Sequence, residues 1–272
     1  MHDYTVTFAT YNCLDYTIKC LKSLIDSGVQ KNKIVVVDNN STDSTVSYLR
    51  NLEIGSLIIN RQNLSCGTAW NQGILANQSE WTIVMNNDVV VSNDFVTKLI
   101  DFAILNNLKL VSPARIDGEL NYDFDEFSTF AQNKTYQALR IGSSNAICMC
   151  IHWSLFNQIG FFRAAPNLLG FEDGIFFNEI RKNNIKHATT GSVWIHHFDG
   201  VTQKYLKKSF NIPVENNLIK VNDRKLYGQS WIERKIYRFN LKKLQHFWKK
   251  DELFKYDMTL HGVRYENKFL WL

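Results

Sequence analysis

The stretch at residues 81–91 constrains the fold most, because a short apolar run there is followed directly by polar residues. The apolar run at residues 83–85 is typical of a strand buried on both faces, as strands of parallel sheets are. The Asn-Asn-Asp triplet at 86–88 then falls at the strand's carboxyl end, where open α/β sheets bind ligands. A carboxylate there can hold a divalent cation against a phosphate, although Asn and Asp also favour plain turns.

Further predicted strands alternate with helical patterns through the first half of the chain. They occur at residues 6–9, 34–37, 57–59 and 108–111. Strands alternating with helices at this spacing predict a doubly wound α/β sheet. Right-handed crossovers place successive strand ends along one edge of the sheet. We therefore expect Tyr11, Asp38 and Asp88 to converge on one cleft.

The second half of the chain has a weaker pattern. Periodicity fades between residues 115 and 140, and the acidic and aromatic stretch at 122–127 is interpreted as a substrate-side loop or short hairpin. Strands are predicted at 145–151 and 187–194, and a short helix at 154–159. Glu172 and Asp173 would begin a further helix, where carboxylates are electrostatically favoured.

The composition indicates a folded protein that does not cross a membrane. The 272 residues allow one large domain, or one domain with an appendage, and 45% of them are hydrophobic. No apolar stretch reaches the roughly 18–20 residues that span a bilayer, and no signal-peptide pattern opens the chain. The five cysteines are odd in number and lack metal-ligand spacing. They suit a reducing compartment, so we expect a cytoplasmic protein.

The basic charge of the chain belongs to residues 201–272, which carry 16 Lys and Arg against 7 Asp and Glu. An amphipathic helix is predicted there from apolar residues spaced by 4, 3 and 4. These residues are Tyr237, Leu241, Leu244 and Trp248. One hypothesis is that the helix rests on an anionic membrane surface; packing on the preceding domain explains the pattern equally well. No nucleic-acid partner is expected, because no recognition motif accompanies the charge.

Short motifs follow one another in a characteristic order over residues 4–202. They are Thr10-Tyr11-Asn12, VVVDNNSTD at 35–43, the stretch 63–73, Asn86-Asn87-Asp88, Gly160-Phe161, Phe171-Glu172-Asp173 and His196-His197. Together they resemble the inverting family 2 glycosyltransferases, especially rhamnosyltransferase-like members that build bacterial surface polysaccharides such as O-antigen or capsule. The resemblance implies a GT-A fold, in which a mostly parallel sheet is flanked by helices.

The resemblance also implies a division of the chain. Residues 1–202 would form the catalytic domain, with a nucleotide-binding half at 1–113 and an acceptor-binding half at 114–202. Residues 203–272 would form a basic helical C-terminal extension. The implied partners are a UDP- or dTDP-linked nucleotide-sugar donor and a glycan or lipid-linked saccharide acceptor.

Donor-binding positions carry over from the motifs of the family. Tyr11 and Asp38 would line the pocket of the nucleotide base, with Asp38 accepting a hydrogen bond from a pyrimidine N–H. The other implied nucleotide-binding residues are Thr10, Asn12, Asn40, Asn63, Gly67, Asn71 and Asn87.

The metal site and the catalytic base carry over in the same way. Asp88 matches the last acid of the family's D-x-D motif, which bridges Mg²⁺ or Mn²⁺ to the diphosphate. Asp173 matches the general base that deprotonates the acceptor hydroxyl, and Glu172 would position the acceptor or its neighbour. One of His196 and His197 would approach the metal or the diphosphate, with His197 fitting the family's spacing slightly better.

The D-x-D motif is incomplete, because Asn86 and Asn87 replace its other acids. One carboxylate with phosphates can still hold Mg²⁺, so we expect weak metal binding before the donor arrives.

Two other functions remain open from the sequence. A nucleotidyltransferase that makes nucleotide-sugars would share the α/β sheet, but the Gly-rich, basic loop that such enzymes usually have after the first strand is missing. A non-catalytic module that binds a nucleotide or sugar is favoured by the two asparagines of the incomplete motif. A Rossmann-type oxidoreductase is disfavoured, since no G-x-G-x-x-G follows the first strand.

Overall fold

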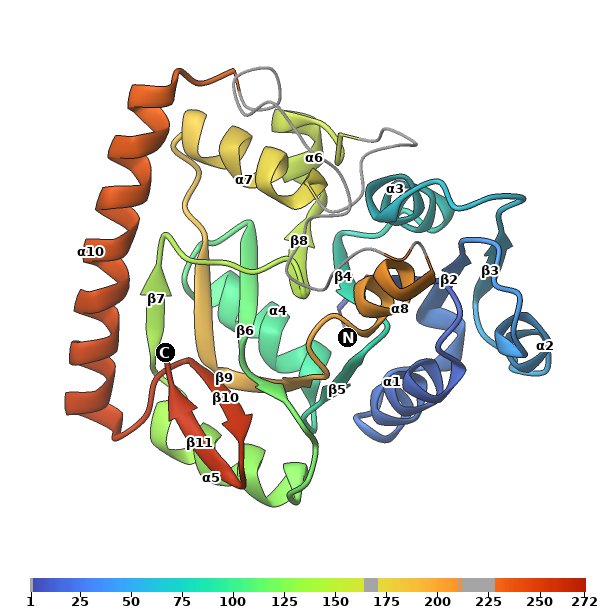
Figure 1. Cartoon of the computed structure of the whole chain (residues 1–272), viewed down its shortest axis with the longest axis horizontal. Helices are drawn as coiled ribbons and strands as arrows, with labels where there is room; N and C mark the ends of the chain where they lie inside the picture. Colours follow the sequence, from blue (N-terminus) through green and yellow to red (C-terminus); the bar gives the residue numbers. More distant parts are fainter. Residues whose placement is uncertain (1, 164–170, 210, 212–227) are drawn as a thin grey trace.

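The computed structural model describes residues 2–163, 171–209, 211 and 228–272. Within this part of the chain, eleven strands form one sheet with helices on both faces (Figure 1). The strands are β1 (Tyr4–Thr10), β2 (Ile34–Asp38), β3 (Ser56–Ile59), β4 (Trp81–Asn86), β5 (Val89–Val91), β6 (Leu110–Gly118), β7 (Leu139–Ile141), β8 (Cys148–His152), β9 (Ala188–His197), β10 (His261–Tyr265) and β11 (Lys268–Trp271).

Helices connect most of these strands. They are α1 (Leu14–Asp26), α2 (Thr45–Arg50), α3 (Cys66–Ala76), α4 (Phe95–Leu105), α5 (Phe124–Thr135), α6 (Trp153–Ile159), α7 (Glu172–Lys182), α8 (Val201–Ser209) and α10 (Trp231–Tyr256), with a short 3₁₀ turn at Lys31–Lys33. The predicted α/β class, with a mostly parallel sheet between layers of helices, is confirmed.

The first, second and fourth strands lie side by side, in the order β4-β1-β2, and all three run parallel. Thr10 of β1 is paired with Asp38 of β2, and Ala9 of β1 with Asn86 of β4. The carboxyl ends of these strands therefore meet at one edge of the sheet, as the sequence predicted. Beyond β4, the antiparallel strand β8 joins this parallel half to β6.

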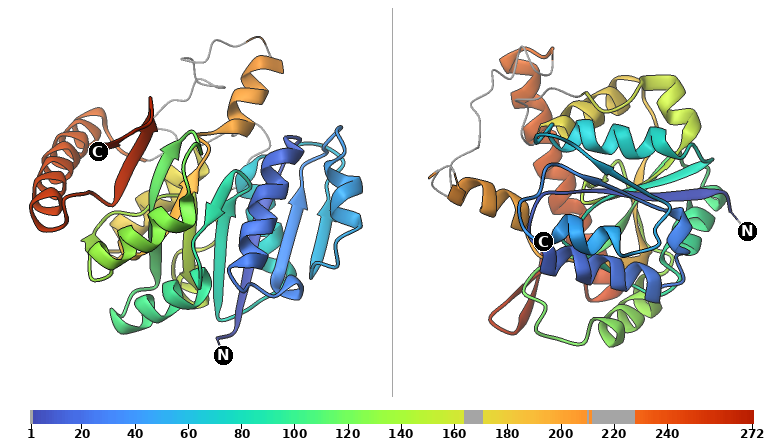
Figure 2. Two further views of the ribbon diagram at one scale, coloured as in Figure 1. Left: turned by 90° about the horizontal axis from the view of Figure 1, so that it is seen from below. Right: turned by 90° about the vertical axis from the view of Figure 1, so that its right-hand side faces the viewer.

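Two apolar layers cover the two faces of the sheet. In the right-hand view of Figure 2, the sheet lies between α3 and α6 on one side and α1 and α2 on the other. Strand β8 shows how the layers are filled, because Cys148 and Cys150 face one layer and Met149 faces the other. These cysteines are free and fully buried. They act as small core residues, on one face of the strand because they are two residues apart.

Helix α5 begins at Phe124, inside the segment 122–127, so the interpretation of residues 124–127 as a loop or hairpin was wrong. Asp123 caps helix α5, and its Oδ1 accepts a hydrogen bond from the backbone N–H of Glu126 at 2.9 Å. The buried face of α5 has the spacing of a helix but mixes apolar and polar residues: Phe124, Ser128, Ala131 and Thr135. Hydrophobic periodicity is therefore weak here, although the cap is recognisable.

Among the described residues of the C-terminal part, the end of α8 and all of α10 are helical; the residues after α10 form β10 and β11, which the expectation of a helical extension did not include. Strand β10 joins the main sheet beside β6, in parallel register. The backbone turns back because Asp257, after α10, adopts a left-handed conformation. No helix among the described residues has the length and apolar character required to cross a bilayer.

Helix α10 is held to the sheet by a buried ion pair. The guanidinium of Arg140 on β7 donates to Glu252 through Nε at 2.7 Å and through Nη2. Glu252 also accepts the backbone N–H of Leu260 at 2.8 Å. Both charged side chains are largely buried, with 11% and 7% of their surface exposed.

We predict that Glu252→Ala lowers the free energy of unfolding by about 3–5 kcal/mol, because it leaves a buried guanidinium without its partner. Urea denaturation of the two proteins would measure this difference. Asp251→Asn is the matched control: it breaks a surface pair with Lys255, and such pairs contribute little. Equal losses in the two variants would contradict a structural role for the Arg140–Glu252 pair.

Candidate functional site

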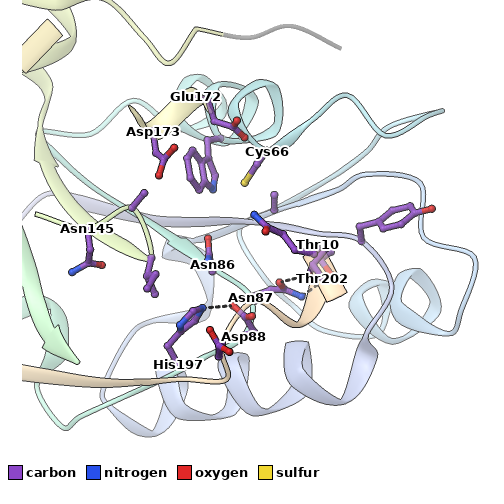
Figure 3. Close-up of a pocket in the computed structure, with 18 of the residues that line it drawn as sticks. Thr10, Cys66, Asn86, Asn87, Asp88, Asn145, Glu172, Asp173, His197 and Thr202 are labelled. Carbon is purple, nitrogen blue, oxygen red and sulfur yellow. Dashed lines mark hydrogen bonds and ion pairs between the residues drawn. The ribbon is translucent and has the colours of Figure 1, made fainter. Parts of the chain in front are cut away.

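A cavity of about 630 Å³ opens at the carboxyl ends of β1 and β4 (Figure 3). This volume lies within the roughly 300–1,000 Å³ typical of small-molecule sites. Strand ends form one part of its wall, and α7, β9 and the start of α8 form another. The lining residues that the sequence predicted are Thr10, Tyr11, Asn63, Asn87, Asp88, Glu172, Asp173 and His197.

Asn87 ties three segments together at the floor of this cavity. Its Nδ2 donates to the hydroxyls of Thr17 at 3.0 Å and Thr10 at 3.3 Å, and its Oδ1 accepts from Thr202 at 3.4 Å. The amide is buried, and these bonds satisfy it. Asn87 therefore fixes the turn that presents Asp88.

Asp88 and His197 lie together because β5 pairs with β9, with Val89 opposite His197. Asp88 is buried, and its Oδ2 accepts the backbone N–H of Val201 at 3.0 Å. Its Oδ1 lies 3.5 Å from Nε2 of His197 (Figure 3). Within the described residues, that buried Nε2 has no hydrogen-bond partner.

The other nitrogen of His197 is held from behind by Asp117 on β6. His197 Nδ1 lies 3.0 Å from Asp117 Oδ1, and His261 Nε2 lies 2.7 Å from Asp117 Oδ2. Arg115 donates through Nε to both oxygens, at 3.1 and 3.2 Å. Burial opposes ionisation of Asp117, but hydrogen bonds from the two histidines and the charge of Arg115 lower the pKa of its carboxyl below its usual range.

His196 lies on the opposite face of β9 from His197, as neighbouring strand residues do. Its Nε2 is 3.1 Å from the carbonyl oxygen of Gly118, and its Nδ1 is 2.9 Å from the hydroxyl of Tyr122. Burial lowers the pKa of His196 to about 4, so the ring is neutral near pH 7. Of the histidine pair, the structure brings His197 to Asp88 and places His196 among aromatic side chains.

The Asp88 and His197 atoms that face each other could hold a divalent cation. A carboxylate oxygen and a buried imidazole nitrogen without a hydrogen-bond partner form a chemically suitable pair of ligands. No cluster of three or more His, Cys, Asp or Glu side chains suited to a metal occurs in the part of the chain that the structure describes. The pair therefore fits a metal that takes its remaining ligands from a phosphate group or water.

Two carboxylates of α7 lie across the cavity from Asp88 and His197 (Figure 3). Glu172 is buried; its Oε1 accepts the N–H of Gly67 at 3.1 Å, and its Oε2 accepts the N–H of Phe171 at 2.7 Å. Asp173 accepts the N–H of Gly174 at 2.7 Å. Burial raises the pKa of Asp173 above the usual value for an aspartate, which makes this carboxylate a better proton acceptor.

Gly67 leaves room for this arrangement. A Cβ at position 67 would come 2.9 Å from Cβ of Glu172, so only glycine lets α3 approach α7 this closely. Gly67 itself does not line the cavity, as far as its wall is formed by the residues that the structure describes. Its contribution to the site is the hydrogen bond to Glu172.

Besides Gly67 and His196, four predicted positions lie outside the described lining. Asp38 is fully buried, and both of its oxygens accept hydrogen bonds from the backbone and hydroxyl of Ser41. Asn71 is paired with the backbone of Phe162, at 2.7 and 3.1 Å. Asn40 is exposed in a left-handed turn.

The fourth, Asn12, bridges the loops after β1 and β2. Its Oδ1 accepts the backbone N–H of Thr42 at 2.7 Å, and its own N–H donates to Ser41 Oγ at 2.7 Å. The loop after β1 is thereby fixed to the loop after β2, so Asn12 shapes the cavity without lining it.

Sequence reasoning did not identify several lining residues, among them Arg115, Asn145, Thr202 and Trp70. Arg115 could have been found, because Arg115 and Asp117 alternate with Ile116 after an apolar strand start, which places both charges on one face. Asn145 and Thr202 belong to loops or helix ends without a local signal.

The family model described as "Glycosyl transferase family 2" matches residues 5–162. No curated protein matches the chain. Three solved structures share its fold with a TM-score of 0.57: the mannosyltransferase PcManGT of Pyrobaculum calidifontis with GDP-Man and Mn²⁺, GalNAc-T7 with UDP, GalNAc and Mn²⁺, and residues 1–349 of S. aureus TarS with UDP-GlcNAc.

Sequence identity to these structures is 16%, 14% and 16%, so the likeness concerns the fold. The alignments cover 77%, 73% and 83% of this chain. They cover only 61%, 44% and 63% of the three solved chains, so this chain spans less than two thirds of each.

Proposed function

We propose that this chain, which belongs to glycosyl transferase family 2, moves a sugar from a UDP- or dTDP-linked donor to a hydroxyl of a glycan or lipid-linked acceptor. The sugar would be a hexose or deoxyhexose, and its anomeric configuration would invert. The observation that carries the proposal is a half-buried carboxylate with a raised pKa, Asp173, facing Asp88 and His197 across one cavity. The order of the motifs supports a rhamnosyltransferase-like member of bacterial surface polysaccharide synthesis.

The donor would occupy the side of the cavity formed by the strand ends. Three solved structures of this fold contain a nucleotide or nucleotide-sugar, two of them with Mn²⁺, which supports a divalent cation here. Asp88 and His197 would hold Mg²⁺ or Mn²⁺, which neutralises the charge that develops on the leaving diphosphate. Arg115 lines the same region and adds a fixed positive charge.

The acceptor hydroxyl would lie against Asp173. Its oxygen attacks the anomeric carbon as the bond to the diphosphate breaks, and Asp173 takes the hydroxyl proton. A carboxylate base contributes about 10²- to 10⁴-fold to such a step. Glu172, held by the backbone of α3, would position Asp173.

The domain division is part of this proposal. Residues 1–113 would bind the nucleotide, and residues 114–202 the acceptor. Residues 203–272 would form the C-terminal extension, which includes the basic helix α10 and strands β10 and β11.

We predict that Asp173→Asn lowers turnover by about 10²- to 10⁴-fold and leaves nucleotide affinity nearly unchanged, because the amide cannot accept the proton. Thermal-shift screening of nucleotide-sugars with Mn²⁺ would identify a donor, and release of free nucleoside diphosphate would measure turnover. Glu179→Gln, on the same helix, is the control. Normal turnover by Asp173→Asn would exclude the residue as the base.

The product separates the three functions that the sequence left open. A glycosyltransferase releases a nucleoside diphosphate, a nucleotidyltransferase releases pyrophosphate from a nucleoside triphosphate, and a binding module releases neither.

The pH profile should show the raised pKa of Asp173. Only the ionised carboxylate can accept a proton, so kcat/KM falls as the pH drops through this pKa. We predict that this acidic limb lies above the pH at which an ordinary aspartate titrates, about 3.9. Initial rates against pH would locate the limb. An acidic limb at or below the ordinary value would contradict the assignment.

Helix α10 provides the surface for the proposed membrane contact. The stripe predicted from the sequence packs on the catalytic domain at Tyr237 and Trp248, whose rings lie under Arg181 and Arg140 at 4.4 and 5.5 Å. The opposite side is exposed and apolar. Its residues are Ile232, Ile236, Phe239, Phe247 and Phe254, each more than half exposed.

Lysines lie among and beside these exposed apolar residues of α10, a helix at the edge of the molecule in Figure 1. They are Lys235, Lys242, Lys243, Lys249 and Lys250. Apolar side chains between lysines are typical of a helix lying in the interface of an anionic bilayer. We therefore propose that α10 contacts the membrane with this side while its inner side stays on the domain.

We predict that the protein sediments with vesicles that contain phosphatidylglycerol, but not with phosphatidylcholine alone, and that about 1 M salt weakens binding. The substitutions Ile236→Ser, Phe239→Ser and Phe247→Ser together should reduce binding at least about tenfold, because burying one such side chain is worth roughly 1.5–3 kcal/mol. The double variant Ile104→Ser/Leu105→Ser removes exposed apolar surface from α4 as a control. Unchanged binding by the triple variant would exclude α10 as the contact.

A further inference from the structure

Asp117 joins three segments behind the metal-facing side of His197. Its two oxygens contact His197 Nδ1 on β9 at 3.0 Å, His261 Nε2 on β10 at 2.7 Å, and Nε of Arg115 on β6. Asp117 is not among the described residues that line the cavity. Its carboxylate is therefore placed to act on His197 and not on a substrate.

We infer that Asp117 is a positioning residue, anchored by His261 of the C-terminal strand β10, which holds His197 in the orientation and tautomer that bind a divalent cation. The inference rests on the proposed function, because it takes His197 as a ligand of the cation. It adds two residues, 80 and 64 positions from His197 in the sequence, that the motifs do not contain.

The tautomer of His197 follows from the hydrogen bond to Asp117. An ionised carboxylate has no proton to donate, so Nδ1 must carry the proton of the 3.0 Å contact. The lone pair available to a cation then lies on Nε2, which is buried 3.5 Å from Asp88 Oδ1. Carboxylate partners of metal-binding histidines act in this way.

His261 fixes the carboxylate in turn. Burial lowers the pKa of His261, so its ring is neutral near pH 7 and has one N–H. Nδ1 of His261 lies 3.4 Å from Arg115 Nη2, which can only donate, so the N–H of the ring is at Nε2 and points to Asp117 Oδ2. With Oδ2 engaged by His261, Oδ1 stays turned toward His197.

The sheet register makes this possible. Strand β10 runs parallel to β6, with His261 opposite Arg115 and Val263 opposite Asp117. Strand β10 is therefore linked to the proposed metal site through the carboxylate of Asp117.

We predict that Asp117→Asn weakens Mn²⁺ binding to the protein–UDP complex about 10- to 100-fold. The introduced amide can donate to Nδ1 of His197, which favours the tautomer with the proton on Nε2 and blocks the lone pair. Electron paramagnetic resonance of the full-length protein with UDP, and with dTDP in parallel, would measure the Mn²⁺ affinity. Electron spin-echo spectra would test for coupling of Mn²⁺ to an imidazole nitrogen, which Asp117→Asn should remove.

A purely structural role would not produce this spectroscopic change. Glu119→Gln, exposed and two residues further along the chain, is the matched control. A second pair of variants avoids dependence on the folding of Asp117→Asn: His261→Gln keeps a donor for Asp117 and should retain more Mn²⁺ affinity than His261→Ala.

The outcomes separate the inference from the proposed function. Wild-type protein that binds neither UDP nor dTDP with Mn²⁺, or shows no nitrogen coupling, would refute the metal site itself. Wild-type coupling that persists unchanged in Asp117→Asn, or equal Mn²⁺ affinities of His261→Gln and His261→Ala, would refute the positioning role alone.

Discussion

The parallel pairing of β1 with β2 and β4 is the constraint on which the site depends. Because the three strands end at the same level, the backbone bonds that close the sheet also set the loops: Asn39 N–H donates to the carbonyl of Thr10 at 2.8 Å, and Asn60 N–H to that of Asp38 at 2.8 Å. Side chains that follow these strands have one edge on which to gather. The pairing of the strands therefore determines the floor of the cavity. Helix α7 adds the part of the wall that carries Glu172 and Asp173.

This edge is crowded with buried polar side chains, and most of them serve the fold. A buried polar group without a partner is costly, and Asp38, Asn87 and the amide oxygen of Asn12 all form hydrogen bonds that fix loops. Two nitrogen atoms of the described lining residues, His197 Nε2 and Trp70 Nε1, are instead buried without hydrogen-bond partners. Unsatisfied groups inside a cavity are the ones that a ligand can satisfy.

Local patterns determined how much could be predicted. The buried strands β2 and β4 contain continuous apolar runs, and β1 is rich in β-prone residues, so the neighbourhood of these strands and the position of Asp88 followed from residue patterns and crossover rules. Helix α5 was missed because its buried stripe includes Ser128 and Thr135, which hydrophobic periodicity does not count. From the sequence, the hydrogen bond between Asp38 and Ser41 could not be distinguished from a contact of Asp38 with a ligand, because a turn and a binding loop need the same residue types.

The environment of Asp117 shows what sequence reasoning cannot reach. A buried carboxylate remains ionised only where several donors compensate its lost hydration, and those donors here come from β6, β9 and β10. These donors do not belong to one recognisable sequence motif, and His261 is 144 residues from Asp117. Without β10, Asp117 would lose its contact with His261. Glu252 of α10 accepts the backbone N–H of Leu260, which directly precedes β10. The extension is therefore coupled to the site by electrostatics as well as by packing.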